Sequence, residues 1–245
     1  MSGAIEHKQR NTAGRKRGGH RSAVDAVALL SVPVVLIACA LSGMQQTALI
    51  STLSVLVALV PFFVNLELDR LTPRDIMPIV VFATLAVAGR IVFAPLPNIK
   101  PVSAIVIMAG LSFGRHSGFM VGALAALVSN LFFGQGPWTP WQMYAWGLMG
   151  YGAGVLEDHG AFKHKAIVFV YAALAPLLYG VIMDSYFVVG YLGEINTASV
   201  LTAYGLGALS SLAHAVATVI FLVPIYLPWT HKLKRLKYKY GISTL

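Results

Sequence analysis

The chain has 245 residues, of which 57% are hydrophobic and only 11% are charged. Soluble domains contain about 45–50% apolar and about 25% charged residues, so this composition excludes an ordinary soluble globular protein. The net charge of +9 does not indicate nucleic-acid binding, because the basic residues gather at the two ends of the chain and not on one face of a domain. The single cysteine, Cys39, lies in an apolar run, which excludes a disulfide framework within the chain and a cysteine-based metal site.

Both ends of the chain are polar and basic. Residues 1–22 form a Lys/Arg/Gly-rich tail that has no hydrophobic face to bury, so we expect it to be disordered and to lie close to anionic lipid headgroups. Residues 231–245 form a second basic tail, which begins with the run HKLKRLKYKY. This run either lies along the lipid surface as an amphipathic helix or follows the last membrane span as a positively charged stop, and we favour the stop.

Eight apolar segments lie between the tails and predict an all-α polytopic membrane protein. The first two, 23–41 and 47–63, are separated by a short link and form a predicted transmembrane hairpin within residues 23–66. Residues 67–230 form a predicted core of six helices, whose apolar segments are 76–94, 102–113, 117–133, 141–156, 166–190 and 200–228. Segment 102–113 is short enough to be a re-entrant or broken helix instead of a full span.

Lysine and arginine residues decide the predicted orientation, because they resist translocation and collect in cytoplasmic loops. Of the 18 lysines and arginines, eleven lie in the two tails, so both termini are predicted to be cytoplasmic. With an even number of crossings, the loops at 66–75, 114–116 and 157–165 are then cytoplasmic as well. Only Lys100 lies in an outside loop, and Arg90 lies inside a helix. We therefore expect a multi-pass protein of the cell membrane.

Three loops fall on the predicted outer side, and they differ from plain connections. They are PLPNIKP at 95–101, GQGPWTPW at 134–141 and YLGEINTAS at 191–199. Proline stiffens the second loop, and its tryptophans offer a large aromatic surface. This surface is either an interfacial anchor or the wall of a small-molecule site.

Three polar side chains inside predicted helices lie at similar depth beneath these loops, namely Arg90, Asn130 and Asp184. An ionisable group within a span is costly, so it usually faces a pocket, a partner or water. Arg90 and Asp184 therefore either bind a ligand or pair with each other and lock two helices. The predicted substrate-binding site comprises Arg90, Asn98, Lys100, Asn130, Gln135, Trp138, Thr139, Trp141, Gln142, Tyr144, Asp184 and Asn196.

Two other groups of polar residues are weaker candidates for chemistry. Ser210 and His214 are four residues apart on one helix face, as a nucleophile and its base can be, but a hydrogen-bonded interior histidine is the preferred interpretation. The acidic and histidine residues within 157–164 match no standard metal motif, so we expect a solvated loop that holds neither a metal nor a cofactor.

Small residues recur at four-residue spacing, which lets helix backbones approach closely in lipid. The glycines of this pattern include Gly110, Gly114, Gly118 and Gly122. Thr84 and Ala88 form a similar small face on the first core helix. These residues either pack helices within the chain or dock a partner helix, and the candidate docking residues are Thr84, Ala88, Gly114 and Gly118.

The stretch from Ala86 to Gly154 resembles the substrate-binding S component of energy-coupling factor (ECF) vitamin transporters. The resemblance lies in AGRIVFAPLPNIKPVSAIVIMAG, FGRHSGFMVGALAALVSNLFFGQGPWTPWQM and GLMGYGAG, in this order and spacing. It implies an integral membrane receptor with a six-helix core, which binds a vitamin or related micronutrient near its outer face and has no ATPase of its own. It also implies assembly with a transmembrane coupling subunit and two ATP-binding subunits, and toppling of the S component to release substrate inward.

The resemblance says less about the ligand and the docking face. Among vitamins it favours cobalamin or another corrinoid, and the Trp/Pro-rich loop suits a sizeable flat ligand. Arg90 and Lys100 suit an anionic group, whereas Asp184 suits a cationic or hydrogen-donating one. The docking face of the family is typically AxxxA on the first core helix, where this chain has only Thr84 and Ala88. The hairpin lies outside the six-helix core, and the resemblance assigns it no role.

A stand-alone secondary transporter or channel is the alternative function. It predicts charged residues at the middle of the membrane and internal repeats, and the sequence shows neither clearly. The chain has no GxxxxGKS or GxxxxGKT run, so the energy for transport is expected to come from partner subunits or a gradient. An enzyme within the membrane requires clustered carboxylates, a metal motif or a placed nucleophile and base, and we expect no enzymatic activity.

Overall fold

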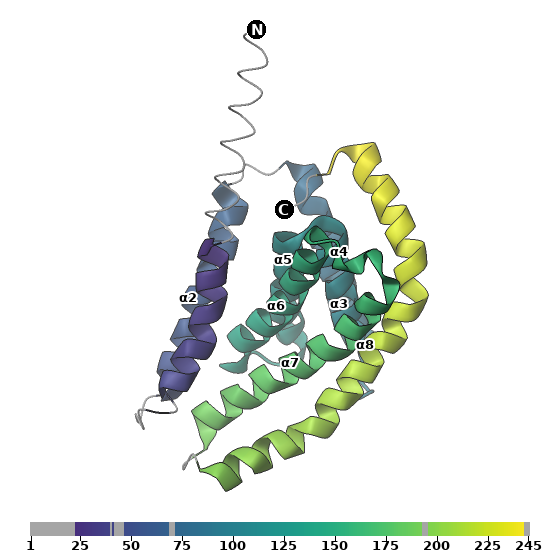
Figure 1. Ribbon diagram of the computed structural model, residues 1–245. Coiled ribbons are helices and arrows are strands. Elements are labelled where there is room, and N and C mark those ends of the chain that lie inside the picture. The colour runs from purple at the N-terminus through teal and green to yellow at the C-terminus, as the bar shows by residue number, and fades with distance from the viewer. Residues whose placement is uncertain (1–22, 40, 42–46, 69–71, 193–195, 243–245) are drawn as a thin grey trace.

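The computed structural model of the chain describes residues 23–39, 41, 47–68, 72–192 and 196–242. These residues form helices joined by short loops, and no strand occurs among them (Figure 1). The predicted all-α fold is therefore confirmed. The disorder expected for residues 1–22 lies outside the described part of the chain.

Every predicted apolar segment is helical, and the helices keep the predicted order. The bounds are Ala23–Cys39 for the N-terminal helix, Thr47–Leu68 for α2, Pro73–Val92 for α3, Val102–Phe113 for α4, Arg115–Phe133 for α5, Trp138–Asp158 for α6, Lys165–Tyr191 for α7 and Thr197–Tyr240 for α8, with a short 3-10 helix, η1, at Ala161–Lys163. Helix α8 continues through the basic run that was expected to follow the last span. Helix α6 begins at Trp138, so the second half of the predicted loop 134–141 is helical.

Among the described residues, four helices are long and apolar enough to cross a membrane, namely α3, α5, α7 and α8. Helix α4 has only 12 residues and is roughly 18 Å long, which is less than the about 30 Å of hydrocarbon in a bilayer. Nearly all of its side chains are buried, because α3, α5, α6 and α8 pack around it. The continuous apolar sequence of this segment therefore reflects burial inside the protein.

Glycines allow α4, α5 and α6 to pack backbone against backbone. A Cβ atom on Gly118 of α5 would overlap the carbonyl group of Gly150 on α6, and a Cβ atom on Gly110 of α4 would overlap the same carbonyl. Gly114 links α4 to α5 with a φ of 99°, a conformation that favours glycine. Gly114 and Gly118 are buried and serve packing within the chain, whereas Thr84 and Ala88 of α3 are exposed.

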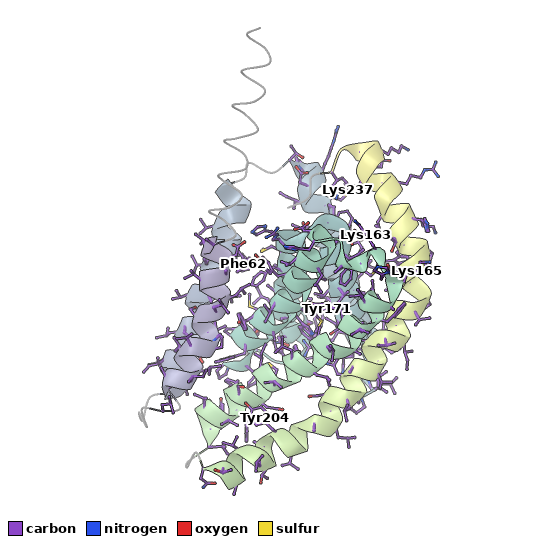
Figure 2. All side chains as sticks on the ribbon, in the orientation of Figure 1. Phe62, Lys163, Lys165, Tyr171, Tyr204 and Lys237 are labelled. Atoms are coloured by element: carbon purple, nitrogen blue, oxygen red, sulfur yellow. The ribbon has the colours of Figure 1, made fainter. Side chains whose placement is uncertain are left out.

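The N-terminal helix and α2 lie side by side along one edge of the molecule, and α8 curves along the opposite edge (Figure 1). Phe62 of α2, labelled in Figure 2, stacks on Phe119 of α5 with ring centroids 3.6 Å apart. Asp25 of the N-terminal helix is fully buried, and its Oδ2 atom lies 2.8 Å from Nε2 of His116. The same oxygen accepts a hydrogen bond from the Tyr151 hydroxyl at 3.2 Å. The hairpin is thus attached to the core by aromatic stacking and by a buried polar cluster.

The two ends of the core differ in the polar side chains that they carry. Lys163, Lys165 and Lys237 lie near one end (Figure 2), where Arg115 and Asp158 also form an ion pair of 2.8 Å. At the other end α3 and α5 finish and α4 and α6 begin. This second end carries most of the polar residues that the sequence singled out.

Candidate functional site

A cavity of about 160 Å³ lies at the end of the core where α3 finishes and α6 begins. Its lining residues are Arg90, Asn98, Lys100, Val102, Gln142, Trp146, Tyr179 and His214. They come from α3, α4, α6, α7, α8 and the loop between α3 and α4. The predicted site residues among them are Arg90, Asn98, Lys100 and Gln142. Convergence of polar and aromatic side chains from separate segments on one cavity is typical of a small-molecule site.

Arg90 lies near the end of α3 and is held by polar and aromatic contacts. Its Nη1 atom donates hydrogen bonds to the Ser129 hydroxyl and, at 2.7 Å, to Oδ1 of Asn130. The guanidinium carbon lies 4.7 Å from the ring centroid of Phe133 and 5.1 Å from that of Trp146, within cation–π range. These contacts compensate in part for the lost hydration of the cation.

Arg90 and Asp184 do not form the ion pair that the sequence left open. Asp184 of α7 packs against Gly207 of α8, where an added Cβ atom would overlap its carboxylate. The ion pairs recorded between described residues do not include Arg90, and no carboxylate is among the cavity's lining residues. The positive charge of Arg90 is therefore not balanced by an acidic residue of this lining.

Asn130, buried in α5, connects Arg90 to the start of α6. Its Nδ2 atom donates to the Thr139 hydroxyl at 3.0 Å and to Oε1 of Gln142 at 2.8 Å. Thr139 donates in turn to Oε1 of Gln135 at 2.8 Å, and Gln135 donates to a backbone carbonyl of α5. One polar network therefore joins α3, α5 and α6 beside the cavity.

A second polar group lies where α4, α6 and α8 meet. The buried Ser103 hydroxyl accepts a hydrogen bond from Nε1 of Trp146 at 3.2 Å and lies 2.7 Å from Nε2 of His214. The Tyr179 ring of α7 stacks on Trp146 and meets the His214 ring edge-on, in each case with centroids 5.1 Å apart. The cavity thus has aromatic walls next to the Arg90 network.

The loop between α3 and α4 contributes an amide and a second cation. Asn98 has a φ of 58°, and its Nδ2 atom donates to the Ser210 hydroxyl of α8 at 3.0 Å. Lys100 donates to a backbone carbonyl of the loop at 3.3 Å. Burial, and then the nearby Arg90 cation, lower the pKa of Lys100 below its ordinary value. Two cations from separate segments are thus held close together.

Ser210 and His214 do not form a nucleophile and base pair. Ser210 accepts the hydrogen bond of Asn98, whereas His214 bonds to Ser103 on α4. His214 therefore has the place of a hydrogen-bonded interior histidine, the interpretation that the sequence favoured.

A family model described as "ECF-type riboflavin transporter, S component" matches residues 72–232 of the chain. The chain belongs to this family. The match includes α3 to α7, most of α8 and every residue of the cavity lining, whereas the N-terminal helix and α2 lie outside it. No solved structure matches the chain.

Family membership confirms the resemblance seen in the sequence. The protein is a substrate-binding S component of an ECF-type vitamin transporter and a multi-pass protein of the cell membrane. As an S component it binds its substrate and is not an enzyme. The description of the family model names riboflavin and gives no support to the corrinoid preference drawn from the sequence.

Two predicted site residues of this S component contact the hairpin and lie outside the cavity lining. Trp141 is fully buried, 5.7 Å from the ring of Tyr186 on α7, and its Nε1 atom lies 3.5 Å from the hydroxyl of Thr52 on α2. The Tyr144 hydroxyl donates to the backbone carbonyl of Leu29 at 2.7 Å. Both side chains therefore connect α6 to the elements that flank the core.

The other predicted residues lie at the rim or farther away. Trp138 is 38% exposed beside Gly136, at the start of α6. Asn196 accepts a hydrogen bond from the backbone N–H of Ser199 and caps α8, as asparagine commonly does at the start of a helix. Asp184 and Asn196 belong to the α7–α8 pair and are not lining residues of the cavity.

Several residues of the candidate site were missed in the sequence. Ser103 and Ser129 are polar residues inside apolar helices, which was a usable signal. Trp146 follows Gln142 by four residues and therefore shares its face of α6. Tyr179 lies in the middle of the apolar α7, and no local pattern distinguishes it from a packing residue.

Proposed function

We propose that this S component captures a vitamin with a flat conjugated ring at the outer face of the membrane and delivers it to an ECF module for ATP-driven import. The observation that carries the proposal is the cavity in which Arg90 and Lys100 lie with the aromatic rings of Trp146 and Tyr179. A few placed polar groups among apolar walls are the usual features of a small-molecule site.

The aromatic walls favour a flat ligand. Trp146 and Tyr179 stack with their ring planes 28° apart, and His214 meets Tyr179 at 89°. A conjugated ring can stack on such faces or meet their edges, and each aromatic pair contributes about 0.5–1.5 kcal/mol beyond the burial of area. Polar groups at the edge of the ligand then have Arg90 and Gln142 as partners.

A flavin is the first candidate for the ligand. The description of the matching family model names riboflavin. The ring system of riboflavin is flat and conjugated, and it has hydrogen-bond acceptors along its edge.

A corrinoid such as cobalamin is the second candidate, and the rim of the cavity is the observation that favours it. Trp138 is 38% exposed, and Gln135 is exposed as well, so a ligand wider than the cavity can rest on the rim. Because cobalamin is much larger than a flavin, its binding depends more strongly on Trp138.

The charge distribution supports an orientation with both termini in the cytoplasm and the cavity outside. Lys163, Lys165 and Lys237 lie at the end of the core away from the cavity (Figure 2), and such residues collect on the cytoplasmic side. In a Cys39→Ser background, Leu96→Cys is expected to react with a membrane-impermeant thiol reagent in intact cells, and Lys163→Cys is not. The reverse labelling pattern contradicts this orientation.

A transmembrane coupling subunit and two ATP-binding subunits are the proposed partners, with the exposed Thr84 and Ala88 of α3 as the docking face. Close approach of helices in lipid requires small side chains. Ala88→Leu is therefore expected to abolish co-purification with the coupling subunit while ligand affinity stays unchanged. Ala208→Leu, a matched change at an exposed alanine of α8, is expected to keep co-purification. Retained assembly in Ala88→Leu contradicts this docking face.

The test of the function is calorimetric binding of a vitamin panel to the purified full-length chain. The panel comprises riboflavin, cobalamin, biotin, thiamine and folate. Saturable binding of riboflavin supports the first candidate, and binding of cobalamin alone supports the second. Failure of the whole panel with a folded protein contradicts the proposal, and uptake into liposomes by this chain without ATP favours a stand-alone transporter.

A further inference from the structure

The direction of the hydrogen bonds around the cavity is fixed by groups that can only donate. The guanidinium of Arg90 has no acceptor atom, so the Asn130 atom that it meets is the amide oxygen. The amide nitrogen of Asn130 then donates to Oε1 of Gln142. The nitrogen of Gln142 is left as a donor beside Tyr179, with which Gln142 lines the cavity. No acceptor for the Tyr179 hydroxyl is recorded among the described residues, so the hydroxyl hydrogen remains available for an acceptor on a ligand.

A second chain of bonds begins at Trp146, whose indole N–H also can only donate. The Ser103 oxygen accepts from Trp146, and no acceptor other than His214 is recorded for the Ser103 hydroxyl among the described residues. The Ser103 hydrogen therefore goes to Nε2 of His214, which makes Nδ1 the protonated nitrogen of the neutral ring. This second chain also ends in a donor.

Both chains of bonds end at one place in the cavity. The rings of Tyr179 and His214 are in edge-to-face contact, 5.1 Å apart, and both line the cavity with the cations Arg90 and Lys100. The amide oxygen of Asn98 is an acceptor in this lining, but donors and positive charge dominate, because no lining residue is acidic. Burial, and then the nearby Arg90 cation, lower the pKa of Lys100, which agrees with two cations held near each other in this lining.

We propose that the cavity binds a phosphate monoester, so that a phosphorylated flavin, riboflavin 5′-phosphate, is the preferred ligand over riboflavin. This inference rests on the proposed function. It goes beyond it by specifying that the preferred substrate is negatively charged. A phosphate monoester carries a charge of about −1.5 to −2 and has only acceptor oxygens near neutral pH, which matches two cations and two neutral donors. A ligand with a single carboxylate leaves one of the two cations without a counter-charge. Uncharged riboflavin leaves both cations without one.

The experiment compares the affinities of riboflavin and riboflavin 5′-phosphate for the purified full-length chain by calorimetry. The phosphorylated form is expected to bind about tenfold more tightly or better, as charge-assisted hydrogen bonds are stronger than neutral ones. Lys100→Met is expected to remove this advantage, so that the two flavins bind with similar affinities, while Lys100→Arg retains the advantage. Lys163→Met, at the opposite end of the core, is the matched control and is expected to behave as the wild type.

A pair of tyrosine variants tests the direction of the first chain of bonds. Tyr179→Phe removes only the terminal hydroxyl and is expected to weaken binding of the phosphate form about tenfold. Tyr186→Phe, on the same helix but bonded to Tyr191, is expected to leave it unchanged.

Equal binding of the two flavins, or a phosphate preference that survives Lys100→Met, overturns the inference and leaves the receptor function standing. Binding of cobalamin without flavin binding has the same consequence. Failure of the folded protein to bind any vitamin contradicts the proposed function as well.

Discussion

Two buried polar clusters of this S component differ in how their charges are matched. Near the start of the N-terminal helix, the carboxylate of Asp25 lies 2.8 Å from Nε2 of His116 and accepts a hydrogen bond from Tyr151. At the other end of the core, Arg90 and Lys100 share a cavity whose lining includes no carboxylate. The first cluster gives an oxygen of the Asp25 carboxyl group polar neighbours within the chain, whereas the second places two cations together.

The difference teaches how to separate a structural cluster from a binding site inside a membrane. Charges there need partners, and a cluster that finds them within the chain attaches one helix to another. A cluster with surplus donors and positive charge is completed by something outside the chain. We therefore assign the Asp25 cluster to attachment of the hairpin and the Arg90 cavity to ligand binding.

Loss of Arg90 is expected to have the largest effect on binding. Arg90→Ala removes a cation and the origin of the network through Asn130, so the Kd for the vitamin that binds is expected to rise about 100-fold or more. Calorimetry on the purified protein measures this change. Arg115→Ala, which breaks the ion pair with Asp158 at the opposite end, is the matched control and is expected to leave the Kd unchanged. Equal effects of the two changes contradict the assignment of the cavity.

Loss of the Asp25 charge is expected to lower stability and not affinity. Asp25→Asn keeps the size of the side chain but removes the buried carboxyl group that meets His116 and Tyr151, which costs about 3 kcal/mol. Such a loss corresponds to a fall in Tm of roughly 6–12 °C for a chain of this size. Thermal unfolding in detergent measures it. A large change in Kd without a change in Tm shows that the Asp25 cluster acts on the ligand.

Tyr144 provides a smaller test of the distinction between residues that attach the hairpin and residues that bind the ligand. Tyr144→Phe removes one hydrogen bond, to the carbonyl of Leu29, and is expected to cost about 1 kcal/mol. Ligand affinity is expected to stay the same, because Tyr144 contacts the hairpin and does not line the cavity. Weaker binding at unchanged Tm shows that the residue belongs to the site, as the sequence predicted.

Trp138 is expected to have the smallest effect if the ligand is a flavin. Trp138→Ala truncates a side chain at the rim that is 38% exposed, so riboflavin affinity is expected to fall only about two- to fivefold. Titration of riboflavin and cobalamin against this variant measures the difference between the ligands. A loss of tenfold or more for riboflavin shows that the rim is part of the flavin site.

The helices could be predicted from the sequence because long apolar runs, separated by Gly, Pro and charged residues, can form few structures other than helices in lipid. The depth of Arg90 and Asn130 followed from their distances to the ends of these runs, and the structure joins the two by a hydrogen bond. Depth alone does not give the direction of a side chain around its helix. Asp184 lies at a similar depth along its own helix but packs against Gly207 of α8.

The sequence assigned residues 134–141 to a loop and 141–156 to a helix, and the predicted site took residues from both without using helical periodicity. Because α6 begins at Trp138, its residues follow helical periodicity. Gln142 and Trp146 share one face, toward the cavity, whereas Trp141 and Tyr144 lie on another, toward the hairpin. Tyr179 and His214 join the site only through the packing of α7 and α8, which no local pattern encodes.

The ligand-induced change in Tm tests the division between the two clusters most directly, because it separates binding from stability in one measurement. A ligand at 100 times its Kd stabilises the folded protein by about 2.7 kcal/mol. The wild type and Asp25→Asn are expected to show the same upward shift from different starting temperatures, and Arg90→Ala is expected to show none. A full shift in Arg90→Ala, or a shift lost in Asp25→Asn, contradicts the assignment of the cavity as the vitamin site.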